Sequence, residues 1–87
     1  MRFQDLPAYQ KSFELAMEIF SISKSFPSEE KYSLTNQIRR SSRSVSAAIA
    51  EATRKRKYEK HFVSKLTDSD AKNAETQVWL EYANACD

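Results

Sequence analysis

The chain has 87 residues and a net charge of +2, and it contains no Gly, two Pro and one Cys. The single cysteine, Cys86, excludes an internal disulfide and a cysteine-based zinc site. No apolar run is long enough to span a membrane and the first ten residues lack the basic-then-apolar order of a secretion signal, so we expect a cytoplasmic protein without a membrane partner. The lack of Gly and the abundance of Ala, Ser, Glu and Lys predict an all-α fold, with residues 1–87 forming one domain of long helices and short turns.

We expect the first helix over residues 5–24. Asp5 can cap its start, and Pro7 is tolerated in a first turn, where backbone N–H groups have no helical partner. Apolar residues then recur every three or four positions, as in an amphipathic helix. They are Leu6, Tyr9, Phe13, Ala16 or Met17, and Phe20. Because nothing polar converges on this aromatic stripe, we interpret it as core rather than as a ligand site.

We expect the second helix over residues 28–56, after a break caused by Pro27. Ser28 can cap it, and the helix is expected to be irregular near Tyr32 before its main run begins at Leu34. An apolar stripe on the main run predicts a face buried in the core. The stripe consists of Ile38, Ser42, Val45, Ile49 and Ala52. Alanines also occur among the arginines of the opposite face, which predicts a central helix with neighbours on both sides.

We expect the third helix over residues 59–85, with two apolar faces about 140° apart on the helical wheel. The first face carries Phe62, Leu66, Ser69, Asn73, Gln77 and Leu80. The second face, the candidate oligomer interface, carries Val63, Ala71, Ala74, Val78 and Tyr82. Since the first two helices can cover only one face, the other predicts either a fourth helix beyond the chain's end or a second subunit.

Positive charge is concentrated between Arg39 and Lys65. That segment has nine Lys and Arg against two Glu, a net charge of +7, while the rest has five against ten, a net charge of −5. Such a cluster attracts polyanions, and the alternative is a solvated hairpin end. The candidate nucleic-acid contacts are Arg39, Arg40, Arg43, Arg54, Lys55, Arg56, Lys57, Lys60, His61 and Lys65. Arg40 and Arg43 could instead bridge to acids of another subunit, and Tyr58 could stack on a base, although we favour its covering the hairpin.

Six short motifs spread along the chain resemble one known family. They are Phe3-x-Asp5-Leu6, Phe26-Pro27-x-x-Glu30, Leu34-x-x-Gln37-Ile38-Arg39-Arg40, Ser44-Val45-x-Ala47-x-Ile49-Ala50-Glu51, His61-Phe62-Val63-Ser64-Lys65-Leu66-Thr67-Asp68-Ser69-Asp70 and Glu75-Thr76-Gln77-Val78-Trp79-Leu80. The chain is similar to bacterial four-helix-bundle proteins encoded by intervening sequences of large-subunit ribosomal RNA genes. Two positions depart from the family pattern, which often has Asn at Ala48 and Gly at Ala52.

The resemblance implies an up-and-down antiparallel helical bundle that assembles as a homopentamer, without catalytic residues or cofactors and with a role in binding RNA or DNA. A similar pentameric barrel occurs in accessory proteins of diversity-generating retroelements, which bind nucleic acid and a reverse transcriptase. Three long helices are expected in this chain, and the family's fourth helix is expected to be missing, because the chain ends where that helix would begin.

Two other functions are alternatives to a non-enzymatic nucleic-acid-binding oligomer. A structural or adaptor module would use the same basic hairpin to dock an acidic protein. A ribonuclease would use the R-x4-H spacing of Arg56 and His61, a short pattern that arises easily by chance in a basic stretch. No metal site is expected, because Asp68 and Asp70 point about 200° apart on a regular helix and cannot hold one ion.

Overall fold

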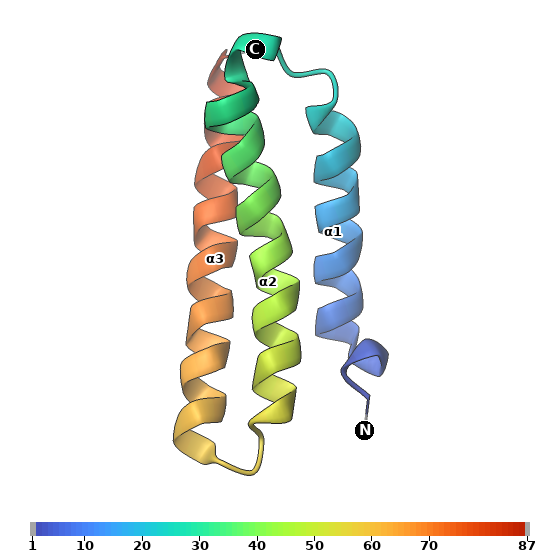
Figure 1. The fold of residues 1–87 in the computed structure, drawn as a ribbon, viewed down its shortest axis with the longest axis vertical. Coiled ribbons are helices and arrows are strands. Elements are labelled where there is room, and N and C mark those ends of the chain that lie inside the picture. Colours follow the sequence, from blue (N-terminus) through green and yellow to red (C-terminus); the bar gives the residue numbers. More distant parts are fainter. Residues whose placement is uncertain (1, 87) are drawn as a thin grey trace.

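The computed structural model describes residues 2–86. Within them, three long helices run alternately up and down: α1 spans Pro7–Ser23, α2 spans Asn36–Arg54 and α3 spans Glu59–Cys86 (Figure 1). These residues contain no strand, so the prediction of an all-α helical bundle with three helices is confirmed. None of the described helices combines the length and the apolar character needed to cross a bilayer. The turn expected at the chain's end, leading into a fourth helix, lies outside the described residues.

The start of α1 differs from the prediction in its cap. Pro7 is the first residue of α1, but Asp5 does not cap it, because Phe3–Asp5 forms a separate 3₁₀ turn. The Leu6 N–H donates to the Phe3 carbonyl at 3.1 Å, which closes that turn just before the helix begins. Leu6 therefore occupies the capping position without a side-chain hydrogen bond.

The segment before α2 is helical but irregular. Ser28–Glu30 forms a 3₁₀ turn and Lys31–Thr35 a π-helical turn, so the irregularity expected near the start of this helix is present. The Glu30 carboxylate accepts a hydrogen bond from the Leu34 N–H at 3.4 Å. The side-chain cap therefore comes from Glu30 and not from Ser28. The Glu30 side chain is long enough to reach the Leu34 N–H, four residues later, across the wider π-helical turn.

α2 is the central helix and packs against α1 on one side and α3 on the other, as predicted (Figure 1). Its apolar stripe is buried as expected: Ile38 is completely buried and Ala52 is 1% exposed. Val45 and Ser42 are also buried, and Ile49 is half-buried. The helix with the most neighbours thus supplies most of the core, and its small residues let both neighbours approach closely.

Hydroxyl side chains link the helices across both interfaces. Between α1 and α2, the Ser12 and Ser46 hydroxyls share a hydrogen bond of 2.9 Å. Between α2 and α3, the Thr76 hydroxyl donates to Ser41 Oγ at 2.9 Å, and the Ser69 hydroxyl donates to a backbone carbonyl of α2 at 3.3 Å. Among the described residues, no buried side-chain nitrogen or oxygen lacks a partner. The polar groups inside the bundle are therefore paired, as burial requires.

The prediction that the aromatic stripe of α1 is core holds only for Ala16, since the aromatic rings of the stripe are half-buried or exposed. Phe13 and Met17 are each 51% exposed, whereas the buried face of α1 carries Ala16, Ile19 and Ser23. α1 packs mainly against a single helix, α2, so only a narrow strip of its surface is covered. Because the neighbouring face of α2 is built from small residues, the small side chains of α1 fit against it better than its aromatic rings.

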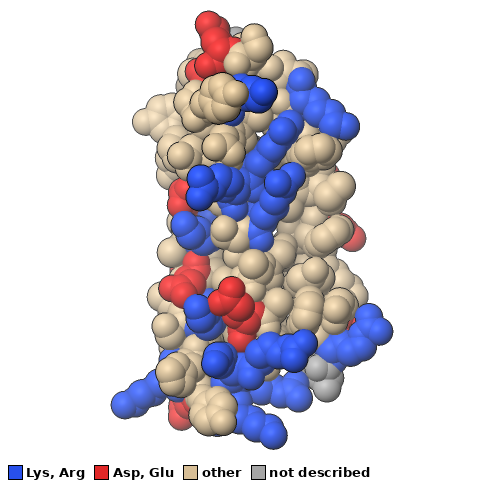
Figure 2. Space-filling view, viewed as in Figure 1, with Lys and Arg blue, Asp and Glu red and all other residues tan. Residues whose placement is uncertain are grey.

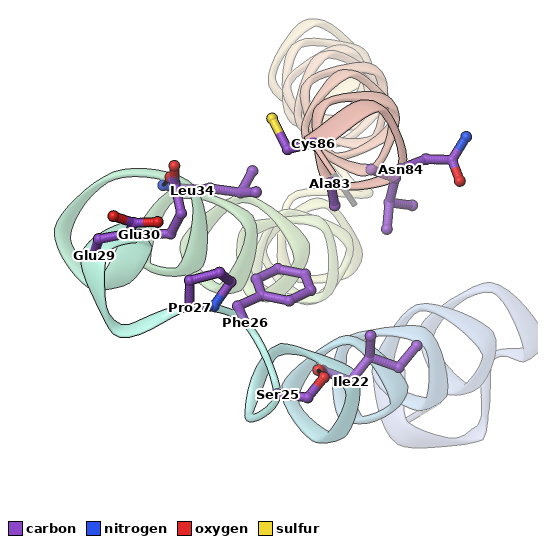
Figure 3. Close-up of a pocket in the computed structure, with 11 residues that line it drawn as sticks. Ile22, Ser25, Phe26, Pro27, Glu29, Glu30, Leu34, Ala83, Asn84 and Cys86 are labelled. Atoms are coloured by element: carbon purple, nitrogen blue, oxygen red, sulfur yellow. Dashed lines mark hydrogen bonds between the residues drawn. The ribbon is translucent and has the colours of Figure 1, made fainter.

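The three-helix bundle is open between α1 and α3, which make few contacts with each other. The accessible surface is 6412 Å², whereas a compact protein of 10.1 kDa exposes about 5,300 Å². One hollow of about 350 Å³ lies between the upper ends of α1 and α3, where Ile22, Leu34 and Ala83 face one another beside Phe26 (Figure 3). Leu66, on the first apolar face of α3, is 40% exposed. α1 therefore leaves part of that face uncovered, contrary to the expectation that two helices would hide it.

Candidate nucleic-acid interface

The basic residues that follow α2 form an exposed hairpin tip. α2 ends at Arg54, two residues earlier than expected, because the Lys55 backbone leaves the helical region with φ −102° and ψ 7°. The Tyr58 N–H donates to the Lys55 carbonyl at 2.8 Å and closes the turn before α3 begins at Glu59. Figure 2 shows Lys and Arg side chains gathered at this lower end of the molecule. The exposed basic residues of the hairpin tip are Arg54, Lys55, Arg56, Lys57, Lys60 and His61.

Tyr58 does not cover the hairpin, so that interpretation is wrong. Its side chain is 62% exposed, and its ring meets the His61 ring edge-on with a centroid distance of 6.3 Å. The turn is closed by backbone hydrogen bonds and does not depend on the ring. An exposed aromatic ring among cations is the arrangement that stacks on unpaired bases.

Lys65 differs from the tip residues because it is already paired. Its Nζ lies 2.9 Å from the Glu51 carboxylate and 3.8 Å from that of Asp68. The hydrogen bond to Glu51, together with the negative charge of that group, raises the pKa of Lys65. A phosphate would have to displace these carboxylates, so Lys65 is a weaker candidate contact than its unpaired neighbours.

Two of the three arginines at the start of α2 belong to a second basic cluster. The guanidinium carbons of Arg39 and Arg43 lie 4.7 and 5.7 Å from the centroid of the Phe20 ring, and Lys24 Nζ lies 4.9 Å from it. Arg39 Nε also donates to the Ser23 hydroxyl at 2.7 Å. We call Lys24, Arg39 and Arg43 around this ring the Phe20 cluster. Figure 2 shows basic side chains gathered over the upper half of α1 and α2.

Arg40 lies apart from both clusters, on the side of α2 that faces α3. It contributes positive charge near Glu75, whose pKa is held below its usual range mainly by a hydrogen bond from Trp79 Nε1 at 3.0 Å. Lys72 donates to the same carboxylate at 3.4 Å. The positive charge of Arg40 therefore lies near the Glu75 carboxylate, and the structure separates Arg40 from Arg39 and Arg43.

The structure thus divides most of the predicted basic patch between two clusters, one near the start of α2 and one at the turn from α2 into α3. Arg43 and Arg54 are eleven residues apart, which corresponds to about 16 Å along α2. Sequence reasoning missed Lys24 and Phe20 as members of the upper cluster. Their spacing of four residues is a signal for a cation over a ring, but their approach to the arginines of α2 depends on the packing of α1.

The structure also places the candidate oligomer interface and the Arg56–His61 pair. All five candidate interface residues of α3 are exposed in the single chain, with Val63, Val78 and Tyr82 exposed by 53%, 46% and 56%. Arg56 and His61 both lie on the exposed hairpin tip. Within residues 2–86, no three His, Cys, Asp or Glu side chains come together as metal ligands would.

Comparison with known proteins identifies a family. A family model described as 23S rRNA-intervening sequence protein matches residues 4–87. No curated protein and no solved structure matches the chain. The matched range contains all three long helices and both basic clusters.

Proposed function

The chain belongs to the 23S rRNA-intervening sequence protein family, and we propose that it is a non-enzymatic, oligomeric protein that binds RNA or DNA. The observation that carries the proposal is the hairpin tip, where basic side chains crowd around one turn. Among the described residues, no basic residue of the hairpin tip forms an ion pair, whereas the nearby Lys65 does. Unpaired cations at this spacing attract phosphates and release their counterions, which gives binding that depends strongly on salt.

The proposal includes no catalytic step. His61 is exposed on the hairpin tip and its described ring contact is with Tyr58. A general acid or base must instead be held within hydrogen-bond reach of the proton it transfers, usually by a third group that orients it. The exposed position of His61 favours a phosphate contact over proton transfer.

Removing two tip charges should flatten the salt dependence of binding. For the double variant R56A/K57A, we expect the slope of log K against log salt to become less negative by about 1.4 for single strands and 1.8 for duplex DNA. Fluorescence anisotropy with labelled RNA and DNA between about 50 and 200 mM salt measures this slope. The control K11A/K31A removes the same charge from exposed positions outside both clusters.

An equal change of slope in both double variants would show that only net charge matters, and the tip would then not be a site. A chain that binds neither polymer at low salt, but binds an acidic protein, would be an adaptor instead.

The second apolar face of α3 should hold the subunits together. We expect light scattering to report a pentamer of the 10.1 kDa chain, as the family resemblance implies, and V78D to be monomeric, because the carboxylate would be buried in the contact. Val78 is half exposed within the chain, so V78D should retain the helical circular dichroism of the natural protein. Q77D, an exposed neighbour outside this face, is the control. A natural chain that is monomeric at all concentrations contradicts the assembly.

A further inference from the structure

A groove lined by aromatic and small side chains lies where α1 meets α2. We call it the α1–α2 groove; α1 lines it with Tyr9, Phe13 and Met17, and α2 lines it with Ala47 and Ala50. Its volume is about 390 Å³. Because an alanine side chain ends at Cβ, α2 leaves open the space that larger residues would fill.

The α1 wall of this groove is a row of aromatic rings. Tyr9 lies between Phe3 and Phe13, with ring centroid distances of 5.0 and 6.1 Å. Phe13 is 51% exposed, although removing a phenylalanine ring from water is energetically favourable. Exposed rings next to an open groove offer flat apolar surfaces on which a planar group can stack.

The Phe20 cluster stands at one end of this groove. Arg43 belongs to both, since it lines the groove and also lies 5.7 Å from the Phe20 ring centroid. Any two charges of the cluster lie within about 11 Å, close to the screening length at 0.1 M salt, so they repel one another. None of the three forms an ion pair with a described carboxylate. An anion held between them would relieve this repulsion.

We infer that the α1–α2 groove binds single-stranded nucleic acid, with a base stacked on Phe13 and phosphates held by the Phe20 cluster. The inference rests on the proposed function and adds a second site to it, of a different kind from the hairpin tip. Apolar rings beside cations suit a strand whose bases are free to leave the stack, whereas a duplex shows only its backbone and groove edges. Another copy of this chain would have to bring an acidic surface against the three cations of the Phe20 cluster, and the mass measured by light scattering tests that alternative.

The two sites can lie on one strand. Arg43, Ala47, Ala50 and Arg54 fall within an arc of about 60° on the surface of α2. A strand leaving the Phe20 cluster can therefore follow this face of the helix, pass over the groove and reach the hairpin tip about 16 Å away.

Replacing Phe13 tests the groove separately from the tip. We expect F13A to weaken binding of a labelled single-stranded oligouridylate about 5- to 150-fold, as loss of one stacking ring does, and to leave binding of an RNA duplex of the same length unchanged. F13W retains a ring and should bind the single strand as well as the natural chain does. L15A removes an apolar side chain that is 38% exposed and lies outside the groove, and it should have no effect.

Each outcome separates the inference from the function on which it rests. If F13A binds the single strand normally while R56A/K57A weakens it, the groove is not a site and the tip proposal stands. If the natural chain binds no nucleic acid, both proposals fall. If F13A changes the mass measured by light scattering, the groove is a contact between copies of the chain, and the inference is overturned.

Discussion

Replacing Ile38 with Ala should lower the free energy of unfolding by about 2–5 kcal/mol. Ile38 is completely buried on the apolar stripe of α2, the helix that contacts both others. The substitution removes the transfer free energy of the lost methyl and methylene groups and leaves a cavity between helices that cannot close without shifting. A domain of this size holds only a small margin of stability, so this one side chain supplies a large part of it.

Thermal and urea unfolding followed by circular dichroism measure the loss at one protein concentration, because assembly makes stability depend on concentration. The expected fall in Tm is about 4–8 °C for each kcal/mol. The matched control is I22A, the same substitution at a residue that is 57% exposed, which should cost much less. Equal losses for I38A and I22A would mean that another segment or subunit buries Ile22 as fully as the chain buries Ile38.

Replacing Thr76 with Val should cost about 1–3 kcal/mol, although the side chain keeps its shape. The Thr76 hydroxyl is 2.9 Å from Ser41 Oγ and 2.8 Å from the Lys72 carbonyl, and the residue is 1% exposed. Without that hydroxyl, the buried Ser41 Oγ retains only its bond of 3.3 Å to the Ile38 carbonyl. The loss is expected because water cannot reach the group to replace the missing partner.

A double-mutant cycle isolates this contact between α2 and α3. The variant S41A/T76V removes both hydroxyls and should be more stable than the two single losses together would make it, by a coupling of about 0.5–3 kcal/mol. T67V is the control, because Thr67 is exposed and its hydroxyl bonds only within α3, to the Val63 carbonyl at 2.9 Å. Additive losses would show that Thr76 and Ser41 do not depend on each other.

Local patterns predicted what depends on local interactions. Pro27 breaks the chain between two helices because its ring restricts the preceding residue, and this effect needs no tertiary contact. The buried stripe of α2 could also be predicted, since a helix with neighbours on both sides buries its apolar side in any arrangement of them. The unpaired charges of the hairpin tip followed in the same way from a run of basic residues at a turn.

The largest failure concerns the aromatic stripe of α1. The stripe has the spacing of a core, yet within it only Ala16 is buried, beside Ile19, and Phe13 remains half exposed. An amphipathic pattern shows that one side of a helix favours burial, but it does not show how much of that side a neighbouring helix can cover. The small residues of α2 pack best against small residues of α1. This complementarity depends on both helix surfaces, so the sequence pattern of one helix cannot predict it.

By itself, the sequence determined that this protein is all-α, where its helices break, which side of α2 is buried and that a basic turn joins α2 to α3, because each of these follows from interactions within a few residues. Only the tertiary structure decided that α1 would leave Phe13 half exposed and that Lys24 would join Arg39 and Arg43 around Phe20. Those contacts join residues far apart in the chain, and which of them form depends on how closely two helices can approach.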